Sequence, residues 1–149
     1  RSSGDTDEWR MSEKASTLAN DYDTSVTSAS ETFPSQINIR DLAHPLVIPN
    51  NCTLEKFSYV IINHSAGSVE ITLGLAKMDY QASGSGLTSV SKIYQTADLS
   101  IPATSMVTVN ETTFDVTSFD EGDLVIPLVI PHDTEMDTDF GGTLYFIER

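Results

Sequence analysis

One apolar segment occurs twice in this chain, each time with two prolines four residues apart. DLAHPLVIP spans residues 41–49 and DLVIPLVIP spans residues 123–131, and the nine positions differ only at the third and fourth. In an extended strand, residues four apart point their backbone N–H groups toward the same neighbour. Proline has no N–H, so both gaps in each copy fall on one flank. Each copy is therefore predicted to lie at a sheet edge or to switch sheets.

The sequence around the two copies favours a structural role for them. NNCTLEKF follows the first copy and HDTEMDTD follows the second, so the flanks give no sign of a duplication. Both faces of the second copy are apolar, whereas a strand with one wet face would be polar on that side. We expect an N-terminal arm or a second copy of the chain to cover the additional face. The face assigned to an oligomer interface consists of Val125, Pro127, Val129 and Pro131.

Most of the chain after Pro34 has the period-two pattern of β-strands. The clearest runs are LEKFSYVII at 54–62, VEITLGLAKM at 69–78 and MVTVNETTFDV at 106–116. Turn signals such as NHSAG and SFDEGD separate these runs. The pattern predicts an all-β sandwich or barrel over 34–149, with the first two runs paired as a hairpin.

Residues 1–33 differ in composition and form a separate N-terminal arm in this interpretation. They are rich in Ser, Thr, Asp and Glu, and Asp5 with Glu8 resembles a capping box for a helix over 6–20. Apolar residues recur at intervals of three or four, as on a helix face. The arm is too poor in large apolar residues to fold alone. We expect it to anchor the domain to a partner or a sister chain through Met11, Leu18, Tyr22, Val26 and Phe33.

The charge of the chain limits its partners. The 149 residues carry a formal net charge of −14, which disfavours binding to nucleic-acid phosphates and to anionic membranes. No apolar run approaches the roughly 18 residues of a membrane span. Cys52 is the single cysteine and opens an apolar strand, so we expect a buried, inert thiol and no structural zinc site.

Few residues suggest chemistry. The three histidines (His44, His64 and His132) are too scattered for a metal motif and are expected to be ordinary loop residues. Nucleotide-binding glycine motifs and the nucleophile elbow are absent from the sequence. The segment DTEMDTD places carboxylates at alternate positions, and these could supply oxygen ligands to Ca²⁺ or form a solvated loop. These candidate ligands are Asp133, Glu135, Asp137 and Asp139.

Three segments carry a family resemblance. They are IPNNCTLEKFSYVIIN, FDEGDLVIPLVI and the closing FGGTLYFIE. Together they resemble the jelly-roll modules of tailed-phage virion proteins, namely tail-fibre or spike knobs and capsid decoration proteins, over about Pro34–Arg149. The resemblance implies a trimeric jelly-roll β-sandwich that is attached by an N-terminal arm and that stabilises the particle or contacts a host receptor. It implies no catalytic residue.

Two functions from different classes follow. The first is a non-enzymatic virion structural protein that forms a homotrimer, binds other virion proteins through its arm and contacts a host surface glycan. The second is a carbohydrate-binding β-sandwich that depends on Ca²⁺ or needs no cofactor. Exposed aromatic residues in a groove would favour the second function, and Tyr80 and Tyr94 are the loop-adjacent candidates.

Overall fold

The computed structural model describes residues 10–12, 22–23, 32–39, 42, 45–80, 86–132 and 137–149. These residues form β-strands and no α-helix, which confirms the all-β prediction. No helix in these ranges has the length and apolar character needed to cross a bilayer. The strands are β1 (Arg10–Ser12), β2 (Tyr22–Asp23), β3 (Gln36–Asn38), β4 (Leu46–Val47), β5 (Cys52–Asn63), β6 (Val69–Met78), β7 (Leu87–Ser89), β8 (Ser91–Gln95), β9 (Leu99–Ile101), β10 (Met106–Glu111), β11 (Ser118–Phe119), β12 (Leu124–Pro131) and β13 (Thr138–Glu148).

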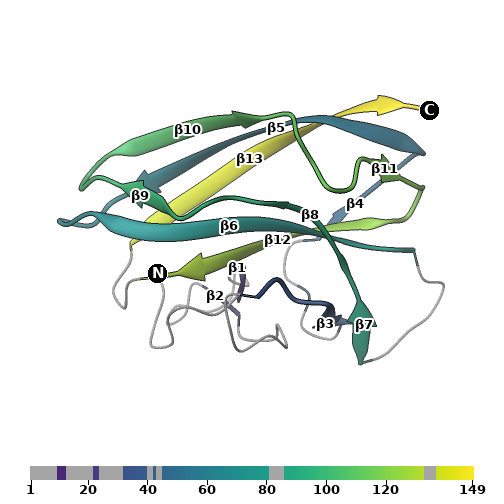
Figure 1. Ribbon diagram of the computed structural model, residues 1–149, viewed down its shortest axis with the longest axis horizontal. Coiled ribbons are helices and arrows are strands. Elements are labelled where there is room, and N and C mark those ends of the chain that lie inside the picture. Colours follow the sequence, from purple (N-terminus) through teal and green to yellow (C-terminus); the bar gives the residue numbers. More distant parts are fainter. Residues whose placement is uncertain are drawn as a thin grey trace.

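Two antiparallel sheets pack face to face in a sandwich (Figure 1). In the first, which we call the β6–β12 sheet, the order is β2-β1-β12-β6-β8, with β4 also beside β12 and β9 also beside β6. In the second, the β5–β13 sheet, β5 lies between β13 on one side and β10 and β11 on the other. A small β3–β7 sheet lies on the side of the β6–β12 sheet that faces away from the sandwich (Figure 1).

The long strands cross between the two sheets twice. β5 and β6 follow each other in sequence but belong to different sheets, and so do β12 and β13. β12 pairs with β6 and β13 pairs with β5, so the later pair of strands lies alongside the earlier pair. The expected hairpin between residues 54–62 and 69–78 is therefore wrong. The alternating pattern identified two half-buried strands, but it did not specify their neighbours.

The sandwich core comes from alternate residues of the facing strands. On β5 the buried side chains include Leu54, Tyr59 and Ile61, and on β6 they include Ile71 and Leu73. The intervening residues of β5 point outward, as the period of two requires. A register shift near Tyr145 and Phe146 of β13 adds one residue to β5, which allows its alternation to restart.

Both faces of β12 are buried within this chain. Val125 and Val129 point into the sandwich core. Ile126, Leu128 and Ile130 point the other way, into a second core beneath β3. The other members of the second core are Ile37, Ala76 and Met78, with Phe33, Ile39, Leu42, Val90 and Leu124 partly buried around them. Phe33, Ile37, Ile39 and Leu42 therefore supply much of the cover that the two-faced apolar pattern required.

The two proline-bracketed copies are neighbours in space, and only one of them behaves as predicted. The first copy contains β4, whose strand partner is β12 alone among the described residues, so it lies at the sheet edge as predicted. The second copy contains β12, which pairs with β6 along its whole length and also with β4 and β1. The edge prediction is wrong for this copy.

The prolines nevertheless explain how the second flank of β12 is built. β12 pairs with β6 at every position, so Pro127 and Pro131 must occupy positions whose amides would point away from β6. On that flank β4 reaches Leu124 and Val125, and β1 reaches Leu128 and Val129. Pro127 lies in the break between these two short pairings, where no hydrogen bond is needed.

The N-terminal arm does not stay clear of its own sandwich. β1 and β2 are strands where a helix over 6–20 and helical spacing were expected, so the helical part of that prediction is wrong at these residues. β1 pairs with β12 and β2 pairs with β1. Pairing with the flank of β12 that β6 leaves open gives the backbone N–H and C=O groups of β1 hydrogen-bond partners. The Thr- and Ser-rich arm has a weak helix propensity, so a helix competes poorly with this pairing.

Candidate functional site

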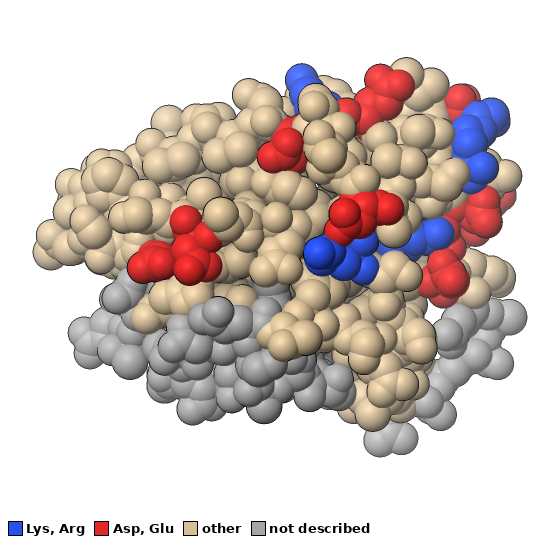
Figure 2. Space-filling model, in the orientation of Figure 1, with Lys and Arg blue, Asp and Glu red and all other residues tan. Residues whose placement is uncertain are grey.

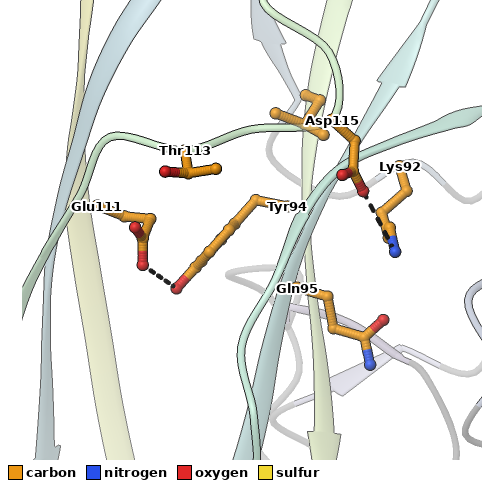
Figure 3. A pocket seen from close by; sticks show the side chains of 7 residues that line it. Lys92, Tyr94, Gln95, Glu111, Thr113 and Asp115 are labelled. Carbon is orange, nitrogen blue, oxygen red and sulfur yellow. Dashed lines mark hydrogen bonds and ion pairs between the residues drawn. The ribbon is translucent and has the colours of Figure 1, made fainter.

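A pocket of about 290 Å³ opens at the margin of the sandwich, between β8 of one sheet and the β10–β11 connection of the other. Figure 3 shows its lining from close by. The lining residues are Lys92, Ile93, Tyr94, Gln95, Glu111, Thr113 and Asp115. Most of these are polar, so the pocket favours a ligand that forms hydrogen bonds over an apolar one.

A β-bulge in β8 brings Tyr94 to this pocket. Leu75 of β6 pairs with Tyr94 and the next residue, Ala76, pairs with Lys92, so Ile93 is an extra residue in β8. A bulge of this kind places two successive side chains on one face. Ile93 is fully buried in the core and Tyr94 packs against the same core. Without the bulge, the Tyr94 side chain would point to the opposite face of the sheet.

The Tyr94 hydroxyl connects the core to the pocket. It donates a hydrogen bond to Oε2 of Glu111 at 3.1 Å and lies 3.4 Å from the Tyr59 hydroxyl. Burial raises the pKa of Tyr94, and the neighbouring Tyr59 and Glu111 raise it further. The phenol is therefore protonated at neutral pH and acts as a donor. Its ring packs edge-on against Phe57 and Phe114, which fixes its orientation.

An ion pair closes the other side of the pocket. Lys92 Nζ lies 3.2 Å from an Asp115 carboxylate oxygen, and the Asp115 backbone N–H donates to the Ile93 carbonyl at 2.9 Å. Figure 2 shows acidic and basic side chains next to each other over the half of this face that contains β8 and β11. With one lysine and two carboxylates, the lining has a formal charge of −1. An anionic ligand is therefore disfavoured.

The two pocket carboxylates already have protein partners. Glu111 accepts hydrogen bonds from the Tyr94 hydroxyl and from the Thr112 N–H, and Asp115 pairs with Lys92. A general base needs an accessible lone pair aimed at the substrate. The arrangement is better suited to exchanging hydrogen bonds with a polyol than to removing a proton from one.

The structure describes only part of the predicted calcium loop. Asp133 and Glu135 lie outside the described residues. Asp137 and Asp139 are exposed, and His64 Nε2 lies 2.9 Å from Asp139 Oδ2. The Asp137 backbone N–H donates to Ser65 Oγ at 3.0 Å. His64 is remote in sequence, so the loop has a side-chain partner that sequence reasoning missed. Within the described ranges, no group of three carboxylate, histidine or cysteine side chains could hold a metal ion.

The residues assigned to an oligomer interface lie elsewhere. Val125 and Val129 are buried in the sandwich core, Pro131 is buried, and Pro127 is half-buried. The two valines therefore cannot form a surface, and assigning them to an interface is wrong. The assignment assumed that one sandwich core could not absorb both faces of the strand, whereas β12 is shared between two cores.

The predicted anchor residues are placed unevenly. Met11 lies in β1 and Tyr22 in β2, both strands of their own chain's sheet. Phe33 packs against the second core. Leu18 and Val26 lie outside the described residues. The expectation that the arm avoids its own sandwich is thus wrong for the three described positions.

A partly buried cluster of Thr72, Asp98 and His132 was not anticipated. Thr72 Oγ1 donates to Asp98 Oδ1 at 2.7 Å and lies 2.8 Å from His132 Nε2. The Asp98 carboxylate lies 3.4 Å from the same ring nitrogen. In a nucleophile–histidine–acid triad the acid holds the other ring nitrogen. This geometry instead holds the end of β12 against β6.

Two further sequence candidates can be placed. Tyr80 is an exposed aromatic residue whose ring covers Gly122, where an added Cβ would lie 2.5 Å from the ring; it does not line the pocket. Cys52 is buried, as predicted, and burial raises the pKa of its thiol. The chain matches no family model, and comparison with curated proteins and with solved structures gives no match either.

Proposed function

We propose that this chain is a non-enzymatic structural module of a tailed-phage virion, of the fibre, spike or capsid-decoration class. It acts as a homo-oligomer, for which the sequence resemblance implies three-fold symmetry. The observation that carries the proposal is the winding of β5, β6, β12 and β13, because the resemblance implied a jelly-roll sandwich over this part of the chain. The virion role itself rests on that resemblance.

The state of the pocket supports a role without catalysis. Glu111 and Asp115 are engaged by Tyr94 and Lys92, and the Tyr94 hydroxyl is held protonated. The buried Thr72 hydroxyl lies in a cluster whose geometry differs from that of a triad. These groups stabilise the packing of strands and leave little catalytic potential in the described part of the chain.

Particle fractionation tests the virion role. Antibodies against the purified chain are applied to density-banded particles from a lysate of the source that encodes it, and immunogold microscopy locates the label. We expect the chain in the particle band and gold at a fixed position on the particle. If the chain is found only in the soluble fraction of a lysate that contains intact particles, the virion proposal is overturned.

Saccharide recognition is the second candidate function, and the pocket around Tyr94 favours it. A volume of about 290 Å³ suits a ligand the size of a sugar ring or two. Gln95 and Thr113 add an amide and a hydroxyl to the ionic groups of the lining. The lining charge of −1 favours neutral saccharides over sialylated or sulfated ones.

Binding to an array of neutral and acidic glycans tests this second function. A Gln95→Ala variant is expected to weaken binding about tenfold, because it removes a hydrogen-bonding group from the lining. Ser91→Ala, on the same strand but outside the lining, serves as the matched control and is expected to bind like the parent chain. Absence of neutral-glycan binding, or equal losses in the two variants, would exclude the pocket as a saccharide site.

A further inference from the structure

The outer face of the β5–β13 sheet is a described surface to which the fold gives no partner. β10, β5 and β13 form the outermost layer on their side of the sandwich (Figure 1). Pairing registers align their outward residues in rows. The first row contains Met106, Ile62 and Asp139, the second contains Thr108, Val60 and Gly141, and the third contains Asn110, Ser58 and Thr143. The face continues with the pairs Lys56–Tyr145 and Thr53–Ile147.

This face combines exposed apolar side chains with uncharged polar ones. Met106 is 63% exposed, Ile147 54% and Tyr145 45%. Val60 and Ile62 form an apolar stripe along the middle strand. The remaining members are mostly uncharged polar residues, such as Thr108, Asn110 and Thr143. Exposed apolar side chains that gather on one face are typical of a contact surface.

The face also has few charges, although the chain as a whole has many. Its middle rows have no charged residue, and its charged members are Lys56, whose Nζ lies 4.2 Å above the Tyr145 ring, and Asp139, which pairs with His64. Glu55, at the register shift, stands beside it. A basic partner would be recognised by carboxylates. A second copy carries the same net charge of −14, so a contact area with few carboxylates repels it least.

We propose that copies of this chain associate through the outer face of the β5–β13 sheet. The occupant is a second copy of the same chain, since a contact between two strongly acidic molecules is least opposed where acidic residues are few. The inference rests on the geometry of this face and not on the virion role or on saccharide binding. It moves the expected interface from β12, which is buried, to the opposite sheet.

The dimensions of the face agree with such a contact. Strands of this length placed side by side give a rectangle of about 35 by 14 Å, or roughly 500 Å² before side-chain relief is counted. A standard interface takes about 800 Å² from each partner, so the face and its rim can supply most of it. Gly141 leaves open space above the second row, since an added Cβ would meet nothing within 4 Å. A side chain of the second copy can enter there.

Light scattering of the full chain, with charge placed on this face, tests the proposal. The parent chain at micromolar concentration in about 0.15 M salt is expected at two or more times 16.3 kDa. Gly141→Glu and Thr108→Glu put a carboxylate in the middle of the face without touching the core. Each is expected to raise the dissociation constant about 100-fold or more, giving a mass of 16.3 kDa.

Gly67→Glu is the matched control, because an added Cβ there also meets nothing within 4 Å and the residue lies in the turn between β5 and β6. It is expected to keep the parent mass. Circular dichroism checks that every variant is folded, and Thr108→Glu decides the result if Gly141→Glu does not fold. A monomeric parent chain overturns the proposal. So does a parent-like mass for the folded face variants, or a monomeric control.

Discussion

Two adjacent glycines in β13 occupy opposite environments. An added Cβ at Gly142 would lie 2.5 Å from Cε2 of Phe57, whereas one at Gly141 would meet nothing. Gly142→Ala is therefore expected to lower the free energy of unfolding by about 1–3 kcal/mol, as overpacking does. Gly141→Ala is expected to leave it unchanged or raise it by about 0.5 kcal/mol. Urea denaturation measures both, and equal effects would contradict the position of the Phe57 ring.

Asp123 is the most strongly engaged carboxylate in the described structure. It accepts hydrogen bonds from the N–H groups of Asp120 and Tyr80, each at 2.8 Å, and Lys77 Nζ lies 3.1 Å away. Burial alone would raise its pKa, but these hydrogen bonds and the Lys77 charge outweigh burial and lower it. The carboxylate ties the β11–β12 turn to the end of β6.

The lowered Asp123 pKa predicts a contribution to acid sensitivity. The contribution is complete above the unfolded value of about 3.9 and is lost as pH falls through the lower, folded pKa. Asp123→Asn should reduce the free energy of unfolding at pH 7 by about 2–4 kcal/mol and flatten its decline below about pH 4. Asp79→Asn, at an exposed carboxylate that also pairs with Lys77, should have little effect. An unchanged acid slope in Asp123→Asn would refute this role.

At the scale of elements, β3 is a short strand with a large structural role. Ile37 is fully buried between β3 and the outer face of β12. Ile37→Ala should lower the free energy of unfolding by about 2–5 kcal/mol, the range for a buried aliphatic truncation. Val47→Ala, at an exposed position of the edge strand β4, should cost less than about 0.5 kcal/mol. If thermal or chemical denaturation showed a similarly small loss of unfolding free energy for both variants, β3 would not be needed to cover the outer face of β12.

The sequence predicted which segments form strands, but it did not predict which strands pair with each other. The period of two identified β5, β6 and the start of β10, and the alternation along 123–131 assigned the two faces of β12 correctly. Pairing partners depend on contacts between distant segments, so the hairpin and the edge position of β12 were wrong. The spacing of apolar residues in the arm predicted a helix, whereas the structure has two short strands there, of which β1 pairs with β12 and β2 pairs with β1.

The candidate site was partly predictable for the same reason. Tyr94 was identified as an aromatic candidate, but Glu111 and Asp115 were not associated with it. They reach the pocket from the opposite sheet, and Tyr94 reaches it through a bulge that alternation cannot reveal. A signal did exist, because Ile93 and Tyr94 are successive large residues within a short strand.

At the scale of the whole molecule, repulsion among like charges competes with ion pairs. The net charge of −14 destabilises the compact state, while ion pairs such as Lys92–Asp115 and Arg149–Asp120 are largely exposed and contribute little. Raising the salt concentration from about 0.01 to 0.15 M should therefore raise the melting temperature, because the Debye length falls from about 30 to 8 Å. A melting temperature that falls with salt would mean that the ion pairs dominate.

β12 joins the sandwich core to the second core, and amide hydrogen exchange in the intact chain tests that position most directly. The amides of Ile126, Leu128 and Ile130, which point toward β6, are expected to exchange only through global unfolding, because both faces of the strand are buried. The amides of the edge strand β4 should exchange much faster. If those of β12 exchanged as fast as those of β4, β12 would not be an interior strand covered on both faces by its own chain.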